Sequence, residues 1–307
     1  MIEIVVYSPF VMRQKTRSLP LGLSSVAWVL LVGIPVWAAT FAVAAKPNVV
    51  VSDFDEEFSN WRKELCCDHS AEVVSSPTRA GEQAVKFTLK RGDPFVANNQ
   101  RAELKLEKVP PNSEKWYGLS VLIPEDFEKD RAYEIITQWH SRPDLEAGEK
   151  WRTPPLAIMI RNNRLFLHRR WDPNPITRNN KPGPGGGRET LPLGNYTPGE
   201  WIDFVVHVKW SHTSDGSLKV WQNNKLVVNE SGPNTYNDPT GPYLKIGLYK
   251  PDWKSNPESS QTTKRIIYFD EVRIGDATAS YQDVKPGDRS TSPRFLRDLA
   301  TRLRLFR

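Results

Sequence analysis

The chain has 307 residues, with 42 basic and 36 acidic side chains, and its 11 Trp, 9 Tyr and 12 Phe exclude a disordered tail protein. A single long uncharged apolar stretch excludes a polytopic membrane protein. Cys66 and Cys67, its two cysteines, are adjacent. Adjacent cysteines are poorly placed to bridge each other, so we expect no disulfide scaffold.

The first predicted element is a targeting segment over residues 1–45. Arg13, Lys15 and Arg17 precede an uncharged stretch from Leu19 to Ala45 that ends in small residues. This order is typical of a secretory signal peptide, and its length leaves an N-terminal membrane anchor as the alternative. Cleavage would give a secreted or periplasmic protein. An uncleaved segment would give a membrane-anchored protein that faces outside the cytoplasm.

Positive charge is concentrated at the two ends of the chain. Residues 1–45 carry a net charge of +2, and the basic C-terminal tail over 285–307 carries +5. Residues 46–284 contain 32 basic and 33 acidic side chains, so their net charge is −1. A near-neutral exported domain is not expected to bind nucleic acid, and any anion must be recognised by a local cluster of cations.

Between residues 46 and 284, apolar and polar residues alternate with the period of two that predicts β-strands. We expect strands at Ala84–Lys90, Arg101–Glu107, Trp116–Ile123, Tyr133–Ser141, Leu156–Arg161, Arg164–Arg170, Trp201–Trp210, Leu218–Gln222, Lys225–Asn229, Tyr243–Tyr249 and Arg265–Ile274. Asn162-Asn163 and Asn223-Asn224 each predict a tight hairpin, because Asn tolerates left-handed backbone angles. The pattern predicts one all-β domain, a two-sheet β-jelly-roll sandwich of the concanavalin-like type.

One predicted strand, Arg101–Glu107, separates an apolar face from a charged face. Its charged face consists of Arg101, Glu103, Lys105 and Glu107. In Tyr133–Ser141, Gln138 and His140 share a face with Ile136.

The strand Tyr243–Tyr249 places Lys245, Gly247 and Tyr249 on its polar face. Because Gly247 has no side chain, we expect a notch there in which a ligand approaches the backbone. A concave outer sheet would gather the polar faces of all three strands into one groove.

These residue types suit proton transfer beside a carboxylate. His140 and Tyr249 can accept and donate protons. Arg101, Lys245 and Gln138 can hold a carboxylate and stabilise the charge that develops on it. A cation near Tyr249, such as Lys245, is expected to lower the pKa of the phenol.

Four motifs resemble the heparin lyase I and glucuronan lyase group of polysaccharide lyases. They are RAEL at 101–104, QWH at 138–140, KIGLYK at 245–250 and YFDEVRIG at 268–275. The resemblance covers roughly residues 50–284. It implies a β-jelly-roll fold and cleavage of a uronic-acid polysaccharide by β-elimination, which leaves a 4,5-unsaturated uronate end.

The resemblance also implies roles for single residues. The catalytic His and Tyr of the group fall on His140 and Tyr249, accompanied by Lys245, and a substrate-binding Arg falls on Arg101. We add Glu103 and Gln138 to the expected substrate-binding residues. The expected partner is an anionic polysaccharide, no cofactor is required, and we expect a monomer. A membrane would be contacted only through an uncleaved N-terminal segment or the basic tail.

Other interpretations stay open. Arg101 and Glu103 could form a simple cross-strand ion pair on a solvated face. A glycoside hydrolase needs two carboxylates across the bond, for which Glu103 and Glu107 are the candidates, although Lys105 lies between them. A non-catalytic carbohydrate-binding protein would share the fold.

Further features have more than one interpretation. Asp53, Asp55 and Glu56 open the domain, and with Asp270 of the last long strand they could hold a structural calcium ion or be ordinary edge carboxylates. Trp253 is a candidate for stacking on a sugar ring. Lys181–Glu189 is expected to be a surface loop, with a flap over the groove as the alternative.

Overall fold

The computed structural model describes residues 47–52, 54, 58–178 and 180–287. The predicted targeting segment and nearly all of the predicted basic tail lie outside these residues. Within the described part of the chain, no helix is long and apolar enough to cross a membrane.

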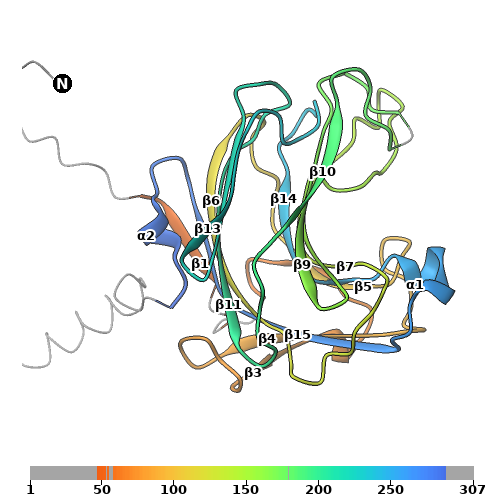
Figure 1. Ribbon diagram of the computed structural model, residues 1–307, viewed down its shortest axis with the longest axis vertical. Coiled ribbons are helices and arrows are strands. Elements are labelled where there is room, and N and C mark those ends of the chain that lie inside the picture. The colour runs from red at the N-terminus through yellow and green to blue at the C-terminus, as the bar shows by residue number, and fades with distance from the viewer. Residues whose placement is uncertain (1–46, 53, 55–57, 179, 288–307) are drawn as a thin grey trace, which may run out of the picture. The chain divides into compact units, whose positions relative to one another are not determined.

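Two antiparallel β-sheets pack face to face to form an all-β jelly-roll sandwich (Figure 1). One sheet, here called the back sheet, has the strand order β13-β12-β11-β6-β15-β4-β3, and β1 pairs with β15. The other, here called the cleft sheet, has the order β10-β9-β8-β7-β14-β5-β2. The predicted fold class is therefore confirmed.

The back sheet consists of β1 (Val49–Ser52), β3 (Ala71–Val74), β4 (Ala84–Lys90), β6 (Glu114–Leu122), β11 (Trp201–Lys209), β12 (Ser217–Gln222), β13 (Lys225–Ser231) and β15 (Lys264–Gly275). The cleft sheet consists of β2 (Arg62–Glu64), β5 (Arg101–Lys105), β7 (Glu134–His140), β8 (Leu156–Arg161), β9 (Arg164–Trp171), β10 (Gly187–Pro192) and β14 (Tyr243–Tyr249). The helices are short: α1 (Asp252–Ser255), α2 (Tyr281–Val284), η1 (Asp68–Ser70) and η2 (Pro257–Ser259).

Every predicted strand is present, with ends that differ by at most two residues. The paired asparagines at 162–163 and 223–224 have positive φ angles, so both predicted hairpins are confirmed. Four strands were not predicted: β1, β2, β3 and β10. They are short, and β10 begins inside the expected surface loop and ends at a proline, which suits its place at the edge of the sheet.

Apolar faces of the two sheets meet in one core. Leu104, Trp139 and Leu167 reach it from the cleft sheet, and Phe87 and Phe204 reach it from the back sheet. Because side chains alternate along a strand, the residues between the core positions of the cleft sheet point to its outer face. This alternation places the predicted functional residues together.

A register shift in β7 changes which of its side chains face the core, so the prediction that Ile136 shares a face with Gln138 and His140 is wrong. The pairing of β7 with β8 slips between Ile135 and Thr137. As a result Ile136 is buried in the core, whereas Ile135 lies on the outer face with Gln138 and His140. Bulges of this kind redirect side chains locally, and the sequence carries no residue type that marks this one.

The pairing of β14 with β5 requires a glycine at position 247. This requirement, and not a notch for a ligand, explains Gly247. Its φ angle is 127°, and a Cβ atom built there would lie 2.2 Å from the carbonyl oxygen of Ala102 on β5. The missing side chain lets β14 approach its neighbour closely.

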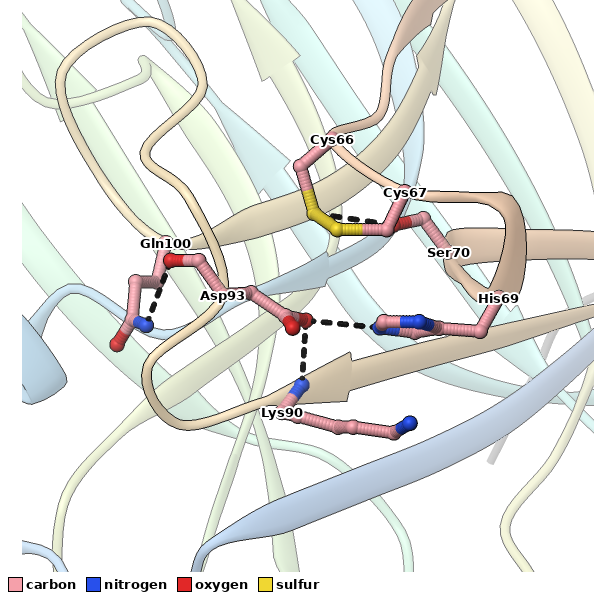
Figure 2. Close-up of a disulfide and its surroundings, with 7 residues drawn as sticks. All are labelled: Cys66, Cys67, His69, Ser70, Lys90, Asp93 and Gln100. Carbon is pink, nitrogen blue, oxygen red and sulfur yellow. Dashed lines mark hydrogen bonds and ion pairs between the residues drawn. A yellow bond between two sulfur atoms is a disulfide. The ribbon is translucent and has the colours of Figure 1, made fainter.

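Cys66 and Cys67 form a disulfide bond directly after β2, so the expectation that they would not bridge is wrong (Figure 2). Their Cα atoms are only 3.7 Å apart, below the usual range for bridged cysteines. The chain turns here into η1, where the amide of Ser70 donates to the carbonyl oxygen of Cys67. Figure 2 shows the bonded sulfur atoms beside Ser70, with His69 reaching across to Asp93.

Candidate active site

A cavity of about 1060 Å³, here called the cleft, lies on the outer face of the cleft sheet. The cations that line it are Arg101, Lys105, Arg152, Arg170, Arg188 and Lys245. The carboxylates that line it are those of Glu64 and Glu189. The cleft is therefore positive although the domain is close to neutral, as expected for anion recognition by a local cluster.

The predicted site residues come together in this cleft. His140, Tyr249, Arg101, Gln138 and Lys245 all line it. The sixth residue, Glu103, lies beneath them with its side chain nearly sealed from solvent. Alternation along β5, β7 and β14 therefore delivers all six to one place.

Two carboxylates organise the cations in the floor of the cleft. Lys245 Nζ lies 2.7 Å from Glu64 Oε2 and 2.5 Å from Glu103 Oε2. Arg101 Nη1 lies 3.1 Å and 3.0 Å from the same two oxygens. Lys105 Nζ donates to Glu64 Oε1 at 2.7 Å. Three cations thus share two carboxylates, and one positive charge remains uncompensated.

The three cations of this network keep the carboxylate of Glu64 ionised. Burial raises the pKa of Glu64, but Lys245, Lys105 and Arg101 outweigh it and bring that pKa down to about 2. Gln138 Nε2 donates to Glu103 Oε1. Gln138 is 0% exposed, as closed to solvent as Lys245, so its amide helps to hold Glu103 in the floor of the cleft.

The hydrogen bonds of this network keep Lys245 and Glu103 from contacting a ligand directly. The side chain of Lys245 is 1% exposed, and its ammonium group already binds two carboxylates. Both residues therefore position Arg101 and Gln138 in this state, without facing the ligand themselves. Arg101 and Glu103 do form an ion pair, but within β5 and buried in the floor of the cleft, so the expected cross-strand pair on a solvated face is wrong.

Glu64, which sequence reasoning missed, connects three cations of the floor. It lies on β2, an edge strand of three residues in which polar and apolar positions do not alternate. Only the pairing of β2 with β5, which sets Glu64 opposite Glu103, brings it into the site.

His140 is arranged as a neutral proton acceptor. Its Nδ1 lies 2.7 Å from the carbonyl oxygen of Ser141, so Nδ1 carries the hydrogen and Nε2 is left to accept. Burial, followed by the charge of Lys245, lowers the pKa of His140 to about 3. The rings of Tyr243 and Trp151 flank the imidazole, each with its centroid at 5.8 Å.

Tyr249 is arranged as a proton donor. Its hydroxyl accepts a hydrogen bond from Asn99 Nδ2 at 3.1 Å, and the guanidinium of Arg101 lies 4.3 Å from its ring centroid. Burial raises the pKa of Tyr249, and Arg101 only partly opposes this. The expected lowering by Lys245 is therefore wrong, because burial dominates and the nearby cation is Arg101.

His140 and Tyr249 do not lie side by side. On β14 the residue paired with His140 is Tyr243, whereas Tyr249 pairs with Ile135 on β7 and with Arg101 on β5. Their side chains nevertheless approach the same cations: the charges of Lys245 and Arg101 act on His140, and the guanidinium of Arg101 lies against the ring of Tyr249.

Trp151 is an exposed aromatic residue of the cleft: it is 60% exposed and lies beside His140. It precedes β8, where no periodic pattern marks it. Trp253 is 5% exposed, packs in the core and donates to Ser260 Oγ. Its predicted role in stacking on a sugar is therefore wrong.

Of the four carboxylates that could hold a calcium ion, Asp270 lies within the described residues. Asp53, Asp55 and Glu56 lie outside the described residues. The carboxylate of Asp270 accepts hydrogen bonds from the backbone amides of Arg79, Ala80 and Glu271. Burial raises the pKa of Asp270 to about 7. Its oxygens are thus committed to backbone amides, which does not favour a cation there.

Within the described part of the chain, Cys66, Cys67 and Asp93 are the three groups close enough to hold a metal ion. The two sulfur atoms are bonded to each other and offer no thiolate pair.

Comparison with known proteins finds a matching family model and several similar solved structures. Residues 52–273 match the family model described as polysaccharide lyase. No curated protein sequence matches the chain significantly. An endo-β-1,4-glucuronan lyase from the fungus Trichoderma reesei has a similar structure, with a TM-score of 0.65 and 24% identity, covering 77% of this chain and 98% of that one. A family 7 alginate lyase in complex with substrate has a TM-score of 0.51 and 11% identity, covering 74% of this chain and 97% of that one. These structures show the shared fold.

Proposed function

The chain belongs to the polysaccharide lyase family, and on that premise we propose that it is an exported enzyme that cleaves a uronic-acid polysaccharide by β-elimination. The observation that carries the proposal is a neutral imidazole, His140, whose Nε2 is left to accept a proton in the same positive cleft as the protonated phenol of Tyr249. Elimination needs one group to remove a proton and another to protonate the leaving oxygen.

The proposed reaction starts with the C5 proton of a uronate. Arg101 holds the carboxylate and stabilises the negative charge that develops when C5–H breaks. His140 Nε2 takes this proton. The electron pair forms the C4–C5 double bond as the bond from C4 to O4 breaks, and Tyr249 protonates O4. No water adds, so the new non-reducing end is a 4,5-unsaturated uronate.

Glu64, Glu103 and Lys245 act indirectly in this scheme. They fix Arg101 and Gln138 through the hydrogen bonds of the cleft floor, which limits the reorganisation needed as charge develops.

An unsulfated glucuronan or related uronan is the substrate class we favour. Three of the six cations in the cleft are bound to Glu64 or Glu103, and Arg152 is bound to Glu149 and Asp238. Few cations therefore remain for a densely sulfated chain. The glucuronan lyase named among the similar structures agrees with this choice. Strong cleavage of heparin with none of glucuronan would contradict it.

The experiment mixes protein beginning at Lys46 with glucuronan, alginate, heparin or chondroitin and follows the ultraviolet absorbance of the conjugated unsaturated uronate. A rise that is lost in His140→Ala and Tyr249→Phe would support β-elimination. Binding without a rise would favour the alternative, a non-catalytic carbohydrate-binding protein. New reducing ends without absorbance would indicate hydrolysis.

A further inference from the structure

Two arginines face each other across the edge of the cleft sheet. Arg170 on β9 and Arg188 on β10 are direct Cα partners, and both line the cleft. Side chains directly opposite on antiparallel strands have Cβ atoms about 5 Å apart, and like charges in this position destabilise the pair. No carboxylate in the described part of the chain forms an ion pair with either arginine.

The neighbouring cross-strand pair on β9 and β10 carries opposite charges. Arg169 and Glu189 are the adjacent Cα partners, and Arg169 Nη2 lies 2.7 Å from Glu189 Oε2 and 3.6 Å from Glu230 Oε2. The same two strands thus pair opposite charges at Arg169 and Glu189 and like charges at Arg170 and Arg188. A bound anion would supply the charge that the second pair lacks.

His168 holds Arg170 in place without neutralising it. His168 Nε2 accepts from Arg170 Nε at 2.6 Å, and its Nδ1 donates to Thr190 Oγ1 at 3.1 Å. Burial, followed by the charges of Arg170 and Arg188, lowers the pKa of His168 to about 4, so the ring is neutral. Nε is engaged and the guanidinium also hydrogen-bonds the neutral hydroxyl of Tyr236, so the remaining N–H groups of Arg170 are left for an anion.

The position of this pair relative to the proposed catalytic centre follows from strand register. Ala157 on β8 is the partner of both Gln138 on β7 and His168 on β9. Arg170, two residues beyond His168, therefore lies level with His140 and two strands away. At the usual strand spacing this is about 10 Å across the sheet, a span comparable to two pyranose rings.

We infer that Arg170 and Arg188 form a second anion subsite, which binds the carboxylate of a uronate about two sugar residues from the one that is cleaved. The inference rests on the proposed function for the identity of the ligand. The subsite anchors the chain and takes no part in proton transfer.

Kinetics test this placement with Arg170→Gln and Arg188→Gln. Arg164→Gln is the matched control, because Arg164 is an exposed cation on β9 that does not line the cleft. On long glucuronan each test variant should raise KM about tenfold, the value of one charge-assisted contact, with kcat unchanged. On the shortest oligosaccharide that is cleaved, KM should not change. An equal loss on short and long substrates, or none on either, would overturn the inference.

A binding assay separates this inference from the proposed chemistry. Mobility is compared in native gels that contain glucuronan (carboxylate only), dextran sulfate (sulfate only) or neutral dextran. Glucuronan should retard the wild type and Arg164→Gln more than the two test variants, whether or not any polymer is cleaved. Equal retardation of all four proteins by glucuronan would overturn the subsite. Arginine-dependent retardation by dextran sulfate alone would overturn its assignment to a carboxylate.

Discussion

The ammonium nitrogen of Lys245 lies 2.5 Å from Oε2 of Glu103, and both side chains are sealed from solvent in the floor of the cleft. A sugar carboxylate could reach Lys245 only by displacing one of its two carboxylate partners. We therefore treat Lys245 as a residue that positions Arg101, while Arg101 lies against the ring of Tyr249.

Replacing Lys245 with Met should destabilise the fold strongly. The change leaves the carboxylates of Glu64 and Glu103 buried with less compensation, and breaking a buried ion pair from one side costs about 3–5 kcal/mol. Lys105→Met is the control, because Lys105 is partly exposed and binds Glu64 alone, so it should cost less than about 1 kcal/mol. Urea unfolding of both variants measures the difference. Equal losses of unfolding free energy in the two variants would show that the buried ion pairs of Lys245 stabilise the fold no more than the partly exposed pair of Lys105.

The two tyrosines of β14 should differ in their effect on catalysis. Tyr249→Phe removes the proposed proton donor and should lower kcat by about 10²–10⁴-fold. Tyr243→Phe keeps the ring that stacks on His140, so kcat should fall less than about tenfold. Absorbance of the unsaturated product measures both rates, and circular dichroism checks that both variants fold. The reverse order would assign the donor to Tyr243, the direct partner of His140.

The low pKa of His140 has a consequence for acid stability. The folded-state pKa is about 3, below the ordinary value of 6.5, so between these values the unfolded chain binds a proton that the folded chain does not. Stability should therefore fall as the pH drops from about 6.5 towards 3. His140→Asn should flatten this slope in urea unfolding at a series of pH values. An unchanged slope, or an imidazole that titrates near 6.5 in NMR spectra, would contradict the assignment.

Strand alternation explains why much of the site could be predicted. Arg101, Gln138, His140, Lys245 and Tyr249 lie on strands with a clear period of two, so their common face can be read from the sequence. Their grouping into one cleft then needs only neighbouring strands in one sheet.

The residues that were missed depend on contacts between distant segments. Glu64 enters through a three-residue edge strand, and Arg188 enters through a strand that begins in a glycine-rich segment. The bulge at Ile136 and the burial of Trp253 depend on packing that no local pattern records. The sign of the Tyr249 pKa shift depends on how deeply the phenol is buried, which spacing alone does not give.

Gly247→Ala should disrupt the pairing of β14 with β5. The new Cβ would collide with the backbone at the carbonyl oxygen of Ala102, and the φ angle of 127° is unfavourable for any residue with a side chain. Gly232→Ala is the control, since Gly232 also has a positive φ, of 100°, but has no atom within 4 Å of a built Cβ. A clearly lower melting temperature for Gly247→Ala than for the control is expected. Equal shifts would mean that backbone strain alone matters there.

Reduction of the disulfide between Cys66 and Cys67 should loosen the segment that follows Glu64. A small-molecule dithiol would be oxidised to its own disulfide as the two cysteines gain hydrogens. The chain-entropy model gives a stabilisation of about 1 kcal/mol for so small a loop, so the loss of stability should be modest. Hydrogen exchange should rise over residues 62–70, and at Asp93, which His69 contacts at 3.1 Å (Figure 2).

The control for reduction is the double variant Cys66→Ser, Cys67→Ser, whose exchange and activity should not respond to the dithiol. Since Glu64 lies two residues before the bond and accepts hydrogen bonds from Arg101, Lys105 and Lys245, reduced wild type should also cleave uronan more slowly. If the dithiol slowed both proteins equally, its effect would lie outside the disulfide. If the reduced wild type kept its full rate while exchange rose, the salt bridges of Glu64 would hold the cleft floor without the covalent bond.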